Sequence, residues 1–456
     1  MFPTEEVSGT ATTALLFAVS VLGLLILAGV ALRLMVAPLR RLFIPAALIG
    51  GVIGAALGPY GAGLVPESMV ATWAGLPGVL ITVVFAPMLI GVKIPNLRQS
   101  YRLVAPQMLF GYMGDFLMIG VPVLVCAALI MPFWDVGAMF GTIVEIGWPG
   151  GHGTAAGMGP VFADLGWADG GPLSLAAATA GLLFGILVGM VLINVGARRG
   201  HVAAVAERGG DTPEVLPEES RGRLGRITLN KDLVDGLAFH GALIAVAVLI
   251  GWVLQALLRQ VVPGMPLFPL AMIGGAVVQA VVGRTRLGEA VDPGSLRAIQ
   301  GAALDLLVVS AVASITVPVV VRNIVPLSIL LLAAAATAVV FFYWAGPRMF
   351  RESWFEMSIV NFGTMTAVSS VGLMLLRAAD PELRTDAARA YSLRAPFFSP
   401  FVGGGLLTAL LPAFAVTYGP WALGGAAVAA AAAVYVLARV LRIWRRPAAR
   451  AARVDA

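Results

Sequence analysis

Residues 147–154 read Gly-Trp-Pro-Gly-Gly-His-Gly-Thr, inside an apolar stretch at about 137–163. No membrane helix runs undisturbed through this stretch, because proline lacks a backbone donor and the glycines permit tight turns. A second broken apolar stretch lies at about 354–376. Broken backbone at membrane depth is tolerated only where protein buries it or where it lines a water-filled cavity. We therefore expect both stretches to be re-entrant hairpins, each entering and leaving the membrane on one side.

The remainder of the chain is typical of a polytopic membrane protein. Of its 456 residues, 59% are hydrophobic and only 12% are charged, which excludes a soluble globular protein. The single Cys126 excludes disulfides and cysteine metal sites. Apolar stretches near 20 residues predict membrane spans. The predicted spans are 11–32, 43–63, 77–92, 104–131, 172–195, 234–258, 266–283, 299–321, 324–345, 396–416 and 420–441.

The basic residues predict the orientation of these spans. If both broken stretches are hairpins and the N-terminus is outside, all but two of the 30 Lys and Arg residues fall in cytoplasmic loops. The two exceptions are Arg259 and Arg322. Because a cytoplasmic excess of Lys and Arg sets membrane topology, we expect the C-terminus in the cytoplasm. The net charge of +6 then reflects topology and does not indicate a nucleic-acid partner.

A sequence repeat relates the two halves of the chain. The pattern Pro-x-Ala-x-Ile-Gly-Gly at 45–51 recurs at 269–275, and Ile-Val-x-x-Gly at 143–147 recurs at 359–363. Each half holds five spans and one hairpin, so the odd number of spans inverts the second half. Inverted repeats with broken helices are a recurring design of secondary transporters. Gly-Gly pairs could simply allow close helix packing, but that alternative leaves the charge distribution unexplained.

The predicted fold class is therefore an all-α polytopic membrane protein with two inverted repeats, each of five transmembrane helices plus one re-entrant hairpin, and an extra C-terminal helix. The predicted parts are a first repeat at 1–195, a cytoplasmic linker at 196–233, a second repeat at 234–416, and the extra helix with a basic cytoplasmic tail at 417–456.

The first hairpin tip is the predicted substrate site. A half-helix N-terminus at this tip would expose backbone N–H groups and attract an anion. His152 adds a donor and Thr154 adds a hydroxyl. The alternative is a structural turn with a satisfied histidine. The candidate substrate-binding residues here are Gly150, Gly151, His152, Gly153 and Thr154.

This tip, together with the Ile-Pro start of the second span, resembles the bacterial sodium/glutamate symporter family, whose members share a Gly-Gly-His-Gly-Thr hairpin. The motif stands here at 150–154. The order of spans, hairpins and central loop is similar over about residues 11–416. The resemblance implies sodium-coupled uptake of glutamate or a close analogue across the bacterial inner membrane. It also implies an elevator-like motion of the hairpin-bearing part, a homodimer, and no cofactor apart from the co-transported sodium ion.

The second hairpin departs from the family pattern. Members usually have a tip that opens with Gly-His-Cys-Gly, whereas residues 361–370 here read Asn-Phe-Gly-Thr-Met-Thr-Ala-Val-Ser-Ser. The second span also has Pro-Ala-Ala at 45–47, where members commonly place a glutamate and a second proline, and the span at 420–441 is extra. The hydroxyls of Thr364, Thr366, Ser369 and Ser370 are candidate substitutes for the glycine contacts to substrate. Back-bonding of these hydroxyls to their own helix is the equally weighted alternative.

Four residues are candidate ligands for sodium: Asp115, Asp305, Glu145 and Asn361. An ionisable side chain at the membrane centre costs roughly 3 kcal/mol on insertion scales, so it normally faces a cavity or a partner. Hard oxygen ligands suit a hard cation. Interhelical hydrogen bonding is the alternative for Asp115 and Asp305.

Four other polar residues are expected to have structural roles. Glu356 lies near Arg351 and is expected at the cytoplasmic interface, and His240 is expected to be a satisfied packing residue. Arg322 and Arg394 flank spans and are expected to extend toward the interface, as long basic side chains commonly do, with guidance of an anion by one of them as the alternative.

The leading hypothesis is a sodium-coupled symporter for an acidic amino acid or a related carboxylate. A carrier of the same fold that uses protons, or that carries another organic anion, is the first alternative. A membrane enzyme using His152 with Glu145 or Asp115 is disfavoured, because the sequence has no His-Glu-x-x-His motif, nucleophile turn or phosphate loop. A passive channel is disfavoured because two hairpins of opposite entry suit alternating access better.

Overall fold

The computed structural model describes residues 6–41, 44–91, 97–202, 225–226, 228, 230, 232–258, 266–380 and 384–445. Within these ranges the chain forms helices and turns and no β-strand. Most of the predicted linker and most of the predicted basic tail lie outside the described residues. Eight described helices are long and apolar enough to cross a membrane, as expected for a polytopic protein. They are α1 (Gly9–Met35), α4 (Glu67–Phe85) with η1 (Ala86–Leu89), α5 (Leu97–Val125) with the π-helical turn η2 (Cys126–Ile130), α9 (Gly170–Arg198), α10 (Gly236–Leu258), α13 (Pro293–Ala313), α15 (Ile324–Met349) and α20 (Pro420–Val440).

Two predicted spans contain shorter apolar helices, α3 (Ala46–Leu57) and α11 (Leu267–Val282), and a third, 396–416, overlaps the short apolar helix α19 (Leu406–Tyr418). The prediction of one continuous span at 396–416 is wrong. Helix α18 (Ala387–Phe398) ends inside that range, and irregular residues 399–405 precede α19. Gly403 and Gly404 have φ angles of 65° and 101°, which lie outside helical geometry and favour glycine.

Both broken apolar stretches are interrupted helices. The first contains η3 (Phe140–Thr142), α6 (Ile143–Gly147), α7 (Gly151–Gly157) and α8 (Gly159–Asp164). The second contains α16 (Trp354–Thr366) and α17 (Ser369–Ala379). Every residue of α6 is buried, and so is α16 from Phe355 onward. The irregular backbone between the paired helices therefore lies within protein, where its polar groups can find partners.

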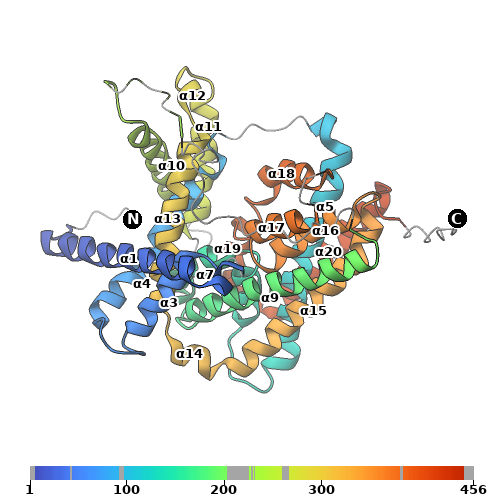
Figure 1. Cartoon of the computed structure of the whole chain (residues 1–456), viewed down its shortest axis with the longest axis horizontal. Helices are drawn as coiled ribbons and strands as arrows, with labels where there is room; N and C mark the ends of the chain where they lie inside the picture. The colour runs from blue at the N-terminus through green and yellow to red at the C-terminus, as the bar shows by residue number, and fades with distance from the viewer. Residues whose placement is uncertain are drawn as a thin grey trace.

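The helices pack as two groups (Figure 1). The first group contains α1, α3, α4, α10, α11 and α13, which come from the first three predicted spans of each half. The second group contains α5, α9, α15, α20 and both interrupted helices. The groups meet where α7 packs on α4 and α13. Short helices α2 (Ala37–Arg41), α12 (Leu287–Ala290) and α14 (Val317–Arg322) connect the longer ones.

The repeated Pro-x-Ala-x-Ile-Gly-Gly motif makes matching contacts within each half. At Gly50 of α3, an added Cβ would lie under 3.0 Å from the Leu25 carbonyl oxygen of α1. At Gly274 of α11, it would lie under 3.0 Å from the Ala247 carbonyl oxygen of α10. Glycine at each position therefore lets the second helix of a half approach the backbone of the first.

The next glycine of each motif makes a matching contact between the halves. A Cβ at Gly51 would lie 2.6 Å from Cβ of Val312 in α13, which corresponds to the third predicted span of the second half. A Cβ at Gly275 would lie under 3.0 Å from the Ala86 carbonyl oxygen in η1, which directly follows α4. Helix α4 corresponds to the third predicted span of the first half. The two copies of the motif thus occupy corresponding positions in the packing of the first group.

The C-terminal helix α20 packs along α5. A Cβ at Gly120 of α5 would lie 3.0 Å from the Val428 nitrogen, and one at Gly424 of α20 would lie 2.6 Å from Cγ of Leu124. Small residues on both helices allow this close approach. The extra helix is therefore an integral part of the second group.

Candidate functional site

Helix α5 runs alongside the second interrupted helix. The Gln107 side chain donates from Nε2 to the Met357 carbonyl oxygen of α16, at 3.0 Å. Further along, a Cβ at Gly114 would lie 2.7 Å from Sδ of Met365, near the end of α16. Asp115 directly follows Gly114 in the sequence. This places Asp115 at the level where α16 is interrupted.

At the first interruption, the backbone makes a tight turn. Gly151 has φ of +66°, in the left-handed region that glycine adopts without steric cost. The Gly150 N–H donates to the Glu145 carbonyl oxygen and the Gly151 N–H donates to the Trp148 carbonyl oxygen, each at 3.1 Å. These two predicted anion donors are therefore already used within the turn. The first-turn N–H groups left for a ligand belong to the next two residues of α7.

His152 is half-buried at the start of α7 and contacts α9. Its Nε2 lies 3.1 Å from the Thr179 hydroxyl, which itself donates to the Leu175 carbonyl oxygen at 3.1 Å. Since the hydroxyl proton is used in that bond, the hydroxyl oxygen accepts from Nε2–H. The histidine is thus oriented by α9 through one ring nitrogen, which leaves Nδ1 as a second polar atom at the tip.

The two interruptions meet each other. A Cβ built at Gly151 would lie under 3.0 Å from Cγ1 of Val368, a residue of the second interruption. Helix α9 covers both: at Gly181, a Cβ would lie 2.5 Å from the Thr366 carbonyl oxygen and 2.6 Å from Cδ1 of Trp148. Segments more than 200 residues apart in sequence thus form one contact region.

The threonine hydroxyls of α16 bond to their own helix. Thr364 donates to the Val360 carbonyl oxygen and Thr366 donates to the Phe362 carbonyl oxygen, each at 2.8 Å. Back-bonding of this kind is common for Ser and Thr in apolar helices. For Thr364 and Thr366, the structure therefore has the back-bonded arrangement that was the alternative to a substrate contact.

The two serines at the start of α17 are exposed. Ser369 accepts a hydrogen bond from the Tyr391 hydroxyl at 2.8 Å, and that hydroxyl also lies 2.9 Å from Oγ1 of Thr364. Tyr391 of α18 therefore links the two arms of the second interrupted helix. Ser370 lies beside this link on the accessible side of the second interruption.

Two carboxylates are buried between these elements. Asp115 is 1% exposed, and neither of its carboxylate oxygens has a hydrogen-bond partner among the described residues. Glu145 of α6 is fully buried, and its Oε1 accepts from the Gly403 N–H at 3.1 Å and from the Thr408 hydroxyl at 3.0 Å. Its Oε2 has no partner within the described part of the chain. Buried oxygens without partners are rare in proteins and require an explanation.

Asn361 adds another buried oxygen to this region. Its Nδ2 donates to Oε1 of Gln107 and to the Met357 carbonyl oxygen, both at 2.7 Å. The amide is therefore held between α5 and α16 with its Oδ1 free of hydrogen bonds to any described residue.

The sequence predicted that Arg394 extends toward the interface, but its side chain is buried. Its side chain is 2% exposed, and its guanidinium lies over the rings of Tyr391 and Phe398, at 4.6 and 4.1 Å from their centroids. A Cβ at Gly111 would overlap Nη1 of this arginine, so the glycine makes room for it. Gly111 lies one helical turn before Asp115, on the same side of α5. A cation thus lies buried in the same region as the buried carboxylates, which offsets part of their desolvation cost.

Asp305 lies apart from Asp115 and Glu145. It is exposed on α13, in the first group of helices. The preceding Leu304 points its Cδ1 toward Gly153, where a Cβ would lie 2.9 Å away. Asp305 is therefore near the first tip but on the opposite group of helices. The structure does not bring all of the candidate cation ligands together.

Glu356, expected at the cytoplasmic interface, has its side chain fully buried in the first turn of α16. The expectation for His240 is confirmed. It is fully buried, its Nδ1 lies 2.6 Å from the Gly236 carbonyl oxygen, and its Nε2 accepts from the Asp292 N–H at 2.8 Å. Both ring nitrogens therefore have structural partners.

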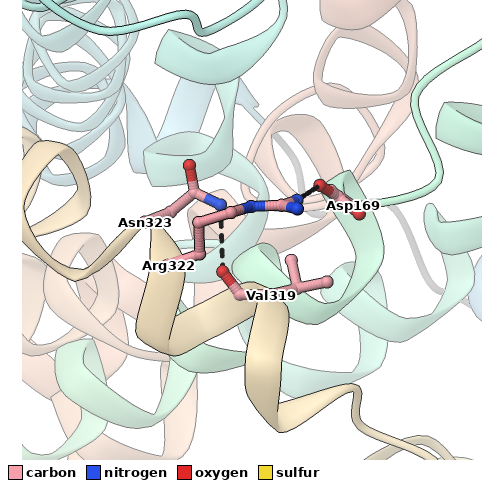
Figure 2. A network of polar contacts seen from close by, with 4 residues as sticks. All are labelled: Asp169, Val319, Arg322 and Asn323. Atoms are coloured by element: carbon pink, nitrogen blue, oxygen red, sulfur yellow. Dashed lines mark hydrogen bonds and ion pairs between the residues drawn. The ribbon is translucent and has the colours of Figure 1, made fainter.

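Arg322 forms an ion pair with Asp169, as Figure 2 shows. Arg322 ends α14 in the second half, and Asp169 directly precedes α9 in the first half. In the same view, Asn323 donates from Nδ2 to the Val319 carbonyl oxygen at 2.9 Å. The arginine side chain is 68% exposed, so the pair contributes little stability. It does place the α14 turn beside the start of α9.

Sequence reasoning missed several residues of this region, and one signal was available. The run Gly-Gly-Gly at 403–405 interrupts a predicted span and marks a backbone that approaches the first tip. No comparable local signal identifies the other missed residues, which are Gln107, Thr179, Tyr391 and Thr408.

Comparison with known proteins gives one family. The model of the sodium/glutamate symporter family matches residues 10–352. The match extends from α1 to the residues just before α16, and it includes the first interruption and both copies of the glycine-pair motif. A comparison with curated proteins finds no match.

Proposed function

The chain belongs to the sodium/glutamate symporter family, and on that basis we propose that it takes up glutamate or a related organic anion together with sodium, by alternating access. The observation that carries this proposal is the meeting of the two helix interruptions beside the buried, unpartnered carboxylate oxygens of Asp115. Irregular backbone, a histidine and buried oxygen ligands together suit a site for an anion and a hard cation. Sodium is cargo in this proposal, and no cofactor is required.

The proposed architecture is a pair of inverted repeats with one re-entrant hairpin each. Gly50 and Gly274 make equivalent contacts within their own halves, and Gly51 and Gly275 make equivalent contacts with the other half. These contacts support the proposal, because the repeated sequence then has repeated packing. The two interruptions support it as well, since each lies in the last third of its predicted half, at 148–150 and at 367–368. Secondary transporters commonly place their sites where such repeats meet.

The proposed motion is a displacement of the second group of helices relative to the first. The contact between the groups runs through small or compact residues. A Cβ at Gly157 of α7 would lie 2.5 Å from Cγ1 of Ile81 in α4, and one at Gly78 would lie 3.0 Å from Cγ of Pro160. Among the described residues no hydrogen bond joins α4 to α7, so displacement at this contact breaks packing contacts only. A homodimer, which the family resemblance implies, remains part of the proposal.

For the substrate, we propose a site between His152 and the exposed serines that follow the second interruption. In its doubly protonated form, the imidazolium would keep its Nε2–H bond to Thr179 and donate from Nδ1–H to a carboxylate of the substrate. Ser369 and Ser370 would contact its other polar end. Because hydroxyls stand where other members have glycines, we propose that selectivity is shifted from plain L-glutamate, which is nonetheless the leading single candidate. A site built to hydrogen-bond one polar group strongly rejects analogues that lack it.

For the cation, we propose that Asp115 is the principal ligand, with Glu145 and Asn361 contributing oxygens. Each of these residues has a buried oxygen without a hydrogen-bond partner in the described chain. Asp305, which is exposed on the other group, is assigned a lesser role. A second candidate function is proton coupling, which the same buried carboxylates favour, because they could bind a proton in place of sodium.

Uptake into proteoliposomes tests the proposed function. We expect radiolabelled glutamate, or another member of a panel of aspartate, 2-oxoglutarate and citrate, to accumulate under an inward sodium gradient. Accumulation under a proton gradient without sodium would select the second candidate. Uptake of only neutral or cationic solutes, or equilibration without any ion gradient, would contradict anion symport altogether.

Replacing His152 by alanine tests the proposed anion contact. Loss of one hydrogen bond to a charged group is worth roughly 1.5–3 kcal/mol, so we expect the substrate concentration for half-maximal uptake to rise at least about tenfold. Thr179→Val, which keeps the imidazole but removes its orienting partner, should give a smaller rise in the same direction. Unchanged substrate dependence in both variants, with normal protein levels, would assign His152 a structural role.

Reporter fusions test the proposed orientation, which follows from the distribution of basic residues. A reporter fused after Ala456 should lie in the cytoplasm, and one inserted at 62–66 should lie outside. The second position is an exposed turn, so insertion there should leave the helices intact. An external signal from the C-terminal fusion would remove one hairpin or one span from the proposed topology.

A further inference from the structure

A separate cavity of about 780 Å³ lies at one end of the second group of helices. Four segments distant in sequence surround it: the start of α5, the turn between α15 and α16, the turn before α18, and the end of α20. The basic-residue distribution assigns each of these segments to the cytoplasmic side. The cavity is therefore distinct from the two helix interruptions, and none of the proposed transport residues lines it.

The cavity is strongly basic. Five arginines line it: Arg102, Arg351, Arg384, Arg442 and Arg445. Two carboxylates, Glu352 and Asp386, line it as well, so the arginines are in excess. Guanidinium groups present planar sets of donors that match phosphate oxygens, and several arginines around one concave space are a typical phosphate-binding arrangement.

The segments that carry these arginines are held in place by the backbone. The Arg445 N–H donates to the Arg348 carbonyl oxygen at 2.8 Å, which ties the end of α20 to the end of α15. The Asp380 carboxylate accepts from the N–H groups of Arg384 and Thr385, at 2.9 and 2.8 Å. These contacts fix the turn before α18. These backbone bonds preorganise the cavity, and Nε of Arg445 also donates to the Arg442 carbonyl oxygen, at 3.2 Å.

The same cavity contains unusual backbone geometry. Ser353 and Arg442 have φ angles of 49° and 57°, and they are the two non-glycine residues with positive φ in the described chain. Both line the cavity. Such conformations cost free energy in ordinary residues and cluster at binding sites, where the surrounding structure maintains them.

Aromatic side chains place the cavity at a membrane interface. Next to it, the Trp444 ring packs on Trp344 and Tyr435, with centroid separations of 4.6 and 4.9 Å, and Tyr101 lines the cavity itself. Tryptophan and tyrosine concentrate at the level of the lipid headgroups. Basic pockets between helices at this level bind anionic headgroups.

We propose that this cavity binds a phosphate-bearing anion, and that α20 completes the site. The family match ends at residue 352, so Arg384, Arg442 and Arg445 lie beyond it. The ligand chemistry is a phosphate group, supplied either by an anionic phospholipid or by a soluble phosphate. Binding would fasten α20 to α5 and α15 within the second group of helices.

The test measures the unfolding midpoint of the detergent-purified full-length protein. The probes are dioleoyl phosphatidylglycerol, dioleoyl phosphatidylcholine and inorganic phosphate. We expect phosphatidylglycerol to raise the midpoint by about 3 °C more than phosphatidylcholine, because a ligand that binds only the folded state stabilises it. The double variant Arg351→Gln/Arg442→Gln should lose at least half of that difference. If inorganic phosphate raises the unfolding midpoint of the wild type by as much as phosphatidylglycerol does, and the double variant loses at least half of that rise, the site is supported and its occupant is a soluble phosphate.

The matched control is Arg198→Gln/Arg297→Gln, which removes two exposed arginines that do not line the cavity. This control should keep the full response. Equal losses in both double variants would overturn the proposal in favour of a general surface-charge effect, and so would no preference for any phosphate probe over phosphatidylcholine. Because the readout is stability and not uptake, the outcome is independent of the transport assays.

Discussion

Replacing Gly151 by alanine is expected to abolish transport while the protein still inserts into the membrane. Two effects act at this position. A residue other than glycine at φ of +66° costs about 1–2 kcal/mol. In addition, the new Cβ would overlap Cγ1 of Val368, so either Val368 changes rotamer or the two interruptions separate. A displacement of about 1 Å at a reacting site costs on the order of 100-fold in rate, and we expect a loss of uptake of that order.

The control for this variant is Gly63→Ala. Gly63 has nearly the same φ, +67°, but an added Cβ there meets no atom within 4 Å. It therefore reproduces the backbone cost without the overlap, and it should keep most of the uptake. The double variant Gly151→Ala/Val368→Ala should recover part of the lost activity because it removes the overlapping methyl groups. Wild-type uptake by Gly151→Ala would show that the contact between the interruptions is not needed for transport.

Replacing Asp115 by asparagine should remove most of the sodium dependence of uptake. The substitution keeps the shape of the side chain and removes its charge. Since both carboxylate oxygens are buried and without partners among the described residues, loss of the charge should weaken cation binding strongly. We expect the sodium concentration for half-maximal uptake to rise at least about tenfold, which corresponds to 1.4 kcal/mol.

Three further variants test whether the effect is specific to Asp115. Asp135→Asn changes an exposed carboxylate before the first interrupted helix and should behave as wild type. Glu145→Gln should have an intermediate effect, because one of its oxygens is already hydrogen-bonded to Gly403 and Thr408. Asp305→Asn should have a small effect, given its exposure on α13. Unchanged sodium dependence in Asp115→Asn would move the cation site to backbone and hydroxyl oxygens of the interruptions.

The sequence by itself determined the class of the protein and the places where its helices break. Long apolar runs predicted the membrane helices because burying some 20 apolar residues in lipid needs no help from a partner. Pro149 and the glycines around it predicted the first interruption, since their effects on the backbone are local. The structure has its breaks at 148–150 and 367–368, within the two stretches that the sequence singled out. The glycine pairs, for which close helix packing was the alternative reading, do lie where helices approach closely.

Only the tertiary structure decided which polar residues are buried together. Asp115 and Asp305 looked equivalent in sequence, yet one is enclosed and the other is exposed. Arg394 and Glu356 looked interfacial and are buried. The physical reason is that lipid is as apolar as a protein interior, so a helix facing lipid and a helix facing protein have similar sequences. The pattern of apolar residues therefore finds membrane helices but cannot tell which of their faces meet, and the contact of Gly151 with Val368 arises only when those faces pack.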